Sequence, residues 1–153
     1  MFERFTKDAK GVVLTALEEA RREGATRTEA EHLLLALATR SGGRAQELLA
    51  AQGLDEAGVR EALRAEEERS LAAVGIAPPE LPEPRPALKH PRTGTSAKVA
   101  LERSLKAATR QRTKRLGPEH VLLGLLEAEG GRVPRALAHA GVDREALAAA
   151  AGT

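Results

Sequence analysis

Apolar residues recur at helical spacing in two separate stretches of this chain. Positions 9, 13, 16, 17 and 20 share one face of a helix and carry only Ala, Val or Leu. Positions 97, 101, 104, 105 and 108 repeat the arrangement with Ala, Leu and one Ser. Each stretch is followed by a short run that is apolar nearly all round, 33–38 in the first case and 121–126 in the second. Helices that are apolar on every side are buried, so these two runs are predicted to form the centre of the molecule.

The two stretches belong to a duplicated unit. The segment EHLLLAL at 31–37 recurs as EHVLLGL at 119–125, 88 residues later. Without gaps, that offset matches 19 of the 57 positions when 6–62 is laid on 94–150. The matches include Glu-His, Gly-Gly-Arg and Gly-x-Asp in one register, which a chance alignment of Ala and Leu does not produce. The chain is therefore predicted to contain one unit twice.

Each unit is predicted to form four helices, which gives an all-α fold of eight helices with no sheet. Gly24 ends the first helix. Thr28 and Glu31 have the spacing of a capping box, with Thr28 as the N-cap of the second helix. Asp55 and Asp143 are the expected N-caps of the fourth helix in each unit.

A proline-rich segment separates the two units. Six of the eight prolines fall between residues 78 and 91. Proline at this density prevents a helix and favours extended chain. We expect a first repeat at 1–75, an exposed and irregular linker at 76–92, and a second repeat at 93–153, with the two repeats forming one pseudo-symmetric domain.

Composition agrees with helices and excludes several classes of function. The chain has 30 Ala and 22 Leu against 9 Val and Ile together, and its aromatic residues are Phe2 and Phe5; strands favour the opposite balance. The absence of Cys excludes disulfides, thiolate metal sites and Cys catalysis. The formal net charge of +2 predicts neither a nucleic-acid binder nor a membrane-surface protein. No leader-like or membrane-length apolar run occurs, so the expected location is the cytoplasm.

The sequence offers little chemistry for catalysis. It has no Gly-rich phosphate-binding loop and no nucleophile-elbow motif, so neither a nucleotide cofactor nor an enzyme is expected. A metal site needs several converging ligands, and the histidines are scattered. His32 and His120 lie just inside helix starts, where we expect them to form local hydrogen bonds. The histidines are His32, His90, His120 and His139.

One run of basic residues contains no acid between positions 103 and 115. A solvated helix face is the simpler interpretation, and a surface for an anionic partner is the alternative. No aromatic residue lies nearby to stack on a base, which argues against nucleic acid. The run consists of Arg103, Lys106, Arg110, Arg112, Lys114 and Arg115.

These motifs resemble the Clp amino-terminal domain, the double-repeat module of Clp-type AAA+ unfoldases that binds substrates and adaptors. The opening MFERFT resembles the ClpC branch, and GPEHVLLGLL at 117–126 matches the family's most recognisable motif. The resemblance covers nearly the whole chain except the proline-rich segment. It implies a module without the ATPase part, similar to stand-alone Clp N-domain proteins.

The resemblance also implies ligand sites. In the ClpC branch, a Thr near the start of the first helix and the Glu of Glu-His bind phosphoarginine. Here Thr6 and Glu31 match in the first repeat, and we expect them to form one pocket. In the second repeat Glu119 matches, but Gly94 stands at the Thr position, with Thr95 as a neighbouring substitute. The alternative role for Glu31 is the capping box alone.

ClpC relatives also bind cyclic-peptide antibiotics in a groove beside the N-terminal Phe. Phe2, Val13 and Lys98 match positions of that groove, whereas Thr93 replaces an aromatic residue of the family. The leading hypothesis is therefore a non-catalytic module that binds Clp substrates, adaptors, phosphoarginine or cyclic peptides and modulates Clp proteolysis. The alternatives are a structural accessory subunit of the Clp protease and, last, an anion-binding or nucleic-acid-binding regulator acting through residues 103–115.

Overall fold

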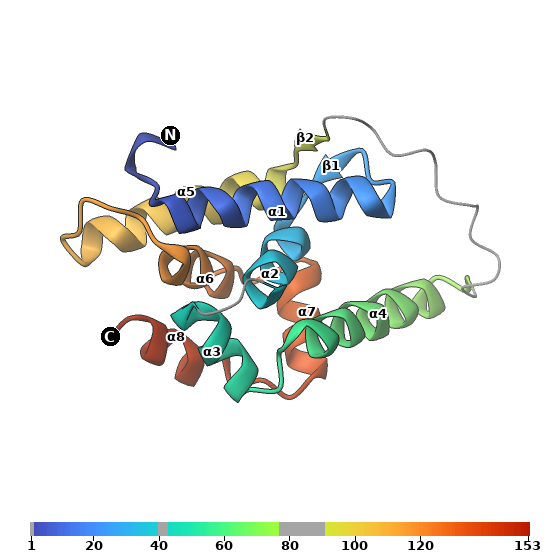
Figure 1. Ribbon diagram of the computed structural model, residues 1–153. Coiled ribbons are helices and arrows are strands. Elements are labelled where there is room, and N and C mark those ends of the chain that lie inside the picture. The colour runs from blue at the N-terminus through green and yellow to red at the C-terminus, as the bar shows by residue number, and fades with distance from the viewer. Residues whose placement is uncertain (1, 40–42, 77–90) are drawn as a thin grey trace.

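The computed structural model describes residues 2–39, 43–76 and 91–153, and within them eight α-helices account for most of the chain (Figure 1). The bulk of the predicted linker, 77–90, lies outside the described residues, as does His90. The elements are η1 (Phe2–Arg4), α1 (Lys7–Glu23), β1 (Arg27–Thr28), α2 (Ala30–Thr39), α3 (Arg44–Ala51), α4 (Glu56–Ala73), β2 (Arg92–Thr93), α5 (Thr95–Arg110), α6 (Pro118–Leu126), α7 (Arg132–His139) and α8 (Arg144–Ala151).

The predicted helix ends are largely those of the structure. The Thr6 hydroxyl accepts a hydrogen bond from the Ala9 amide and caps α1, which ends at Gly24 in the left-handed conformation (φ 76°). Asp55 and Asp143 accept hydrogen bonds from the Gly58 and Ala146 amides, respectively, and so cap the fourth helix of each repeat.

The second helix of each repeat lies at the centre, as the sequence predicts. Every residue from His32 to Ala38 in α2 and from His120 to Leu126 in α6 is buried. The contact between α5 and α6 depends on Gly124, because a Cβ atom there would lie 2.3 Å from the carbonyl oxygen of Ala100. Small residues in this core let the helix backbones approach closely.

The two repeats pack into each other. Helix α4 of the first repeat packs on α7 of the second, and α8 of the second repeat packs on α3 of the first. Likewise α2 contacts α5, and α6 contacts α1. The hydrophobic core therefore runs through both repeats and forms one continuous cluster.

One expectation about the backbone was wrong. The sequence predicts no sheet, but β1 and β2 form a parallel pair in which Arg27 faces Arg92 and Thr28 faces Thr93. Two residues of the segment expected to be exposed and irregular also differ from that expectation, since Pro91 is buried and Arg92 belongs to β2. Strands of two residues carry no alternating pattern, and propensity therefore cannot reveal them.

No helix in the described part of the chain is both long enough and apolar enough to cross a membrane.

Candidate functional site

The start of each repeat's first helix is joined to the other repeat. The Thr6 amide, just before α1, donates to the Leu116 carbonyl at 2.9 Å, ahead of α6. The Gly94 amide, just before α5, donates to the Thr28 carbonyl at 2.7 Å, ahead of α2. Gly94 and Leu116 lie 88 residues after Thr6 and Thr28, so the two bonds are pseudo-symmetric. We call these places the α1–α6 junction and the α5–α2 junction.

Histidine, and not glutamate, caps the second helices. The Glu29 amide donates to His32 Nδ1 at 2.9 Å, and the Gly117 amide donates to His120 Nδ1 at the same distance. The predicted capping box of Thr28 and Glu31 was therefore wrong. Thr28 belongs to β1, the helix begins one residue later than expected, and the third helical position falls on histidine. The two histidines form local hydrogen bonds at helix starts, as expected.

The Nε2 atoms of His32 and His120 have different partners. His32 Nε2 lies 2.7 Å from Glu23 Oε2, while His120 Nε2 lies 2.8 Å from Gln111 Oε1. The hydrogen bond from His32 lowers the pKa of the Glu23 carboxyl. Burial lowers the pKa of His120, because its charged form would lose solvation.

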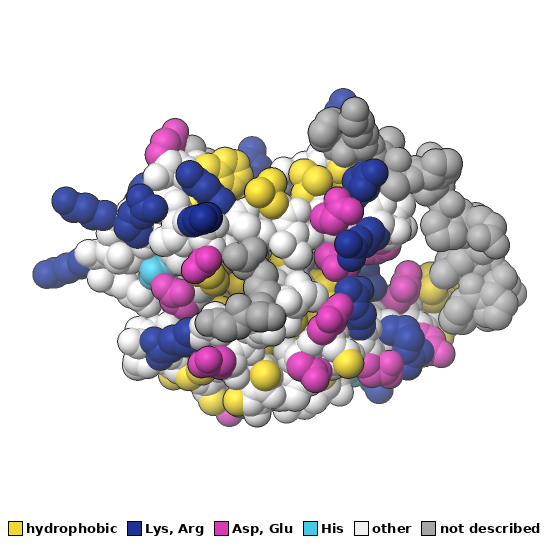
Figure 2. All heavy atoms as spheres, in the orientation of Figure 1, with side chains coloured by type: hydrophobic (Ala, Val, Ile, Leu, Met, Phe, Trp, Pro, Cys, Tyr) yellow, Lys and Arg dark blue, Asp and Glu magenta, His cyan; other side chains and the backbone are white. Residues whose placement is uncertain are grey.

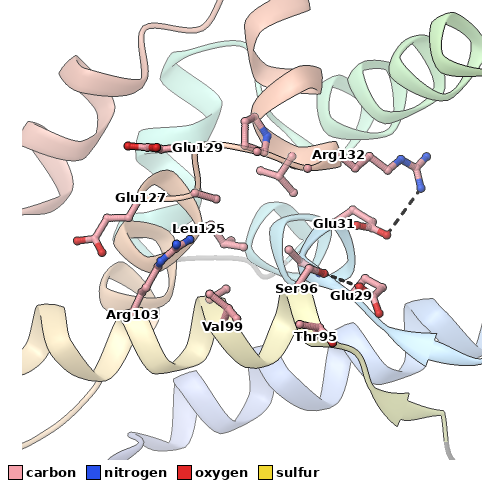
Figure 3. Close-up of a pocket in the computed structure, with 17 residues that line it drawn as sticks. Glu29, Glu31, Thr95, Ser96, Val99, Arg103, Leu125, Glu127, Glu129 and Arg132 are labelled. Carbon is pink, nitrogen blue, oxygen red and sulfur yellow. Dashed lines mark hydrogen bonds and ion pairs between the residues drawn. The ribbon is translucent and has the colours of Figure 1, made fainter. Parts of the chain in front are cut away.

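The structure separates Thr6 from Glu31. Thr6 lies at the α1–α6 junction, beside the start of α6 that carries Glu119. Glu31 and Thr95 line one cavity at the α5–α2 junction, together with Ser96 (Figure 3). The pairing of Thr6 with Glu31 was therefore wrong. It assumed that each repeat builds its own pocket, whereas the start of each first helix is hydrogen-bonded to the residue just ahead of the other repeat's second helix.

Each of the two repeats thus carries a Glu-His motif whose histidine is buried at the start of its second helix. The family model for the Clp repeat (R) N-terminal domain matches residues 4–90 and 92–152. The chain belongs to this family. It is 36% identical over 145 residues to the chloroplastic chaperone protein ClpC1 of Arabidopsis thaliana and to a chloroplastic ClpA homolog of Brassica napus. Each alignment covers 94% of this chain, but only 14% and 15% of those relatives.

Solved structures share the fold of this Clp N-terminal domain. The N-terminal domain of ClpD from Arabidopsis thaliana matches with a TM-score of 0.73 at 22% identity, over 99% of this chain and 94% of that one. The Hsp104 N-terminal domain from Candida albicans matches with a TM-score of 0.67 at 19% identity, over 97% and 89% of the two chains.

The cavity at the α5–α2 junction of this Clp N-terminal domain measures about 860 Å³. Val99, Leu125 and Val133 give it apolar surface. The Glu31 carboxylate on its rim is 14% exposed and forms an ion pair with Arg132 of α7, with 3.8 Å between Oε1 and Nη1 (Figure 3). Sequence reasoning missed Arg132 as a site residue. The repeated Gly-Gly-Arg was a signal for it, because this motif places an arginine at the start of α7.

The residues of the implied peptide groove lie on separate elements. Phe2 in η1 is 45% exposed and packs edge-on against Phe5, with ring centroids 4.9 Å apart. Val13 on α1 is partly buried against the core, and Lys98 on α5 is exposed.

The basic run is divided between two places. Arg103 on α5 lines the cavity at the α5–α2 junction. Arg110, at the end of α5, forms an ion pair with Glu127. The cations Arg112, Lys114 and Arg115 are exposed in the α5–α6 loop, and Lys and Arg side chains project at that end of the molecule (Figure 2). The run is therefore not a single helix face.

Proposed function

We propose that this Clp N-terminal domain is a non-catalytic binding module that holds segments of substrate or adaptor proteins for a Clp unfoldase. Within that function, we propose that the α1–α6 junction binds a phosphoarginine side chain. The observation that carries the proposal is the hydrogen bond from the Thr6 amide to the Leu116 carbonyl, because it joins the start of α1 to the start of α6.

The start of α1 has the chemistry for a phosphate. The amides of a first helical turn and the positive end of the helix dipole favour an anion. The Thr6 hydroxyl adds a further polar group there. Arg4 fixes the neighbouring loop, since its guanidinium donates to the carbonyl oxygens of Thr113 and Lys114.

Glu119 supplies the charge for a guanidinium. Its side chain is one-third exposed at the start of α6. The carboxylate lies where a side chain on residue 117 would stand, because a Cβ on Gly117 would lie 2.6 Å from Glu119 Oε1. A carboxylate and a guanidinium form charge-assisted hydrogen bonds. Since His120 performs the capping, Glu119 is available for a ligand.

Calorimetric titration with free phosphoarginine tests the proposal. Glu119→Gln removes the negative charge with little change in shape. A hydrogen bond to a charged group contributes roughly 1.5–3 kcal/mol, so the affinity should fall about tenfold or more. Glu31→Gln is the matched control at the other junction and should leave this affinity unchanged. The proposal fails if the natural chain does not bind, or if Glu119→Gln binds as tightly as the natural chain.

A second candidate ligand is a cyclic peptide at the N-terminal end. It is favoured by the half-exposed ring of Phe2 and by Leu14 on α1, whose side chain is 66% exposed. Large apolar side chains in solvent favour burial against an apolar ligand. Phe2→Ala should then weaken cyclic-peptide binding without changing phosphoarginine binding.

A further inference from the structure

We propose that two side chains of the chain itself, Glu29 and Arg132, take the places of the phosphate and the guanidinium at the α5–α2 junction and exclude phosphoarginine from it, with the cavity beside them left open. Glu29 lies in the space next to the start of α5, and Arg132 forms an ion pair with Glu31. The two side chains thus decide which of the pseudo-symmetric junctions binds a ligand. The inference rests on the proposed function for its choice of ligand.

The Glu29 carboxylate fills the space at the start of α5. A Cβ atom on Gly94 would lie 1.4 Å from Glu29 Oε1 and 2.2 Å from Glu29 Cδ. With the Glu29 carboxylate in this place, a side chain at position 94 has no room. The carboxylate also places a negative charge near a helix N-terminus, where it is stabilised and where it repels a second anion.

Ser96 holds the carboxylate in this place. Its hydroxyl donates to Glu29 Oε2 at 2.5 Å (Figure 3). The same hydroxyl accepts from the Ala30 amide at 2.8 Å. The hydroxyl thus bridges α5 to the start of α2. A ligand phosphate would have to displace Glu29 and break this bridge.

Arg132 is the second internal group. Its guanidinium lies 3.8 Å from Glu31 Oε1, and it is held from the other side by α4. There it donates to the Leu63 carbonyl at 3.2 Å and lies 3.6 Å from Glu66 Oε2. The carboxylate that could pair with a ligand guanidinium is thus already beside a fixed cation.

The α1–α6 junction has the reverse arrangement. Thr6 stands at the position of Gly94, and Gly117 stands at the position of Glu29. Arg44 stands at the position of Arg132, but it donates to the Ala150 carbonyl and the Thr153 hydroxyl. Exchanging these residues should therefore exchange the behaviour of the two junctions.

The experiment is a calorimetric titration of phosphoarginine into four full-length chains, with free arginine as the control ligand. We expect one binding site in the natural chain and two in the triple variant E29G/G94T/R132Q. The reciprocal variant T6G/G117E should have none. The double variant E29G/G94T leaves the ion pairs of Arg132 intact and should gain a second, weaker site, which keeps the test valid if the triple variant does not fold.

Each outcome decides between the two proposals. Two sites in the natural chain, or no additional site in folded E29G/G94T and triple variants, would overturn the inference. If the natural chain binds nothing but the triple variant binds one phosphoarginine, the proposed α1–α6 site fails and the closure of the α5–α2 junction stands. If no variant binds, both are wrong.

Discussion

The α1–α6 and α5–α2 junctions have matching backbones and different side chains. In each, the amide before a first helix donates to the carbonyl just ahead of the other repeat's second helix. At the α1–α6 junction, Thr6 caps α1 and Gly117 precedes α6. At the α5–α2 junction, Gly94 and Glu29 stand at those positions. The comparison shows that the pseudo-symmetry of the fold does not extend to the chemistry of its two junctions.

The fourth helices differ as well. Helix α4 has 18 residues and α8 has 8. The additional length of α4 brings Glu66 to Arg135 and to Arg132, which lines the cavity at the α5–α2 junction. The ion pair between Arg132 and Glu66 thus depends on a part of the first repeat that α8 does not have.

The largest expected effect tests whether the two repeats form one core. Leu34 and Leu122 occupy matching positions and are fully buried. Leu34→Ala and Leu122→Ala should each lower the free energy of unfolding by about 2–5 kcal/mol. Because the core is continuous, each variant should unfold in a single transition in urea, followed by circular dichroism. Two separate transitions would show that the repeats fold independently.

A smaller loss of stability is expected from replacing Glu66, which lies in the part of α4 that has no counterpart in α8. Glu66 is almost fully buried and binds Arg135 at 3.0 Å and the Ser70 hydroxyl at 2.9 Å. Glu66→Ala should lower the free energy of unfolding by about 1–3 kcal/mol, since its arginine partners are partly exposed. Glu67→Ala is the control, because its side chain is 54% exposed, and should change stability by less than about 1 kcal/mol. Equal losses would contradict the role given to Glu66.

The smallest effect concerns pH. Burial holds the pKa of His120 below its usual value of 6.5, so the unfolded chain binds the proton more readily and stability falls as the pH drops below about 6.5. Gln111→Glu would give His120 a carboxylate partner like that of His32 and raise its pKa. The loss of stability between pH 7.5 and pH 5.5 should then shrink by about 0.5 kcal/mol. Thermal unfolding at both pH values checks this, and an unchanged loss would contradict it.

Much of the fold could be predicted because helices leave periodic signals. The apolar runs at 33–38 and 121–126 identify the two central helices, and Asp55 and Asp143 identify helix starts. The two-residue strands could not be predicted, since they have no period. The start of α2 was misplaced for a second reason: Thr28 has the right type for an N-cap, but its pairing with Thr93 is a tertiary contact.

The sequence predicts the residue types of the candidate site better than their arrangement. Duplication identifies Glu31 and Glu119 as equivalent residues, but it does not reveal that the start of each first helix is joined to the other repeat. The Glu31–Arg132 ion pair joins residues about a hundred positions apart and depends on the packing of α7. Only the three-dimensional structure shows that Glu29 lies in the space beside Gly94.

The central claim is that the two junctions, alike in backbone, differ in ligand binding. Nuclear magnetic resonance of the ¹⁵N-labelled natural chain tests it directly, with amide shifts recorded during a titration with phosphoarginine. We predict saturable shifts for the amides of residues 6–9, 117, 119 and 120, and none for residues 94–97 and 29–32. Saturable shifts of similar size at both junctions, or shifts confined to the α5–α2 junction, would contradict the claim.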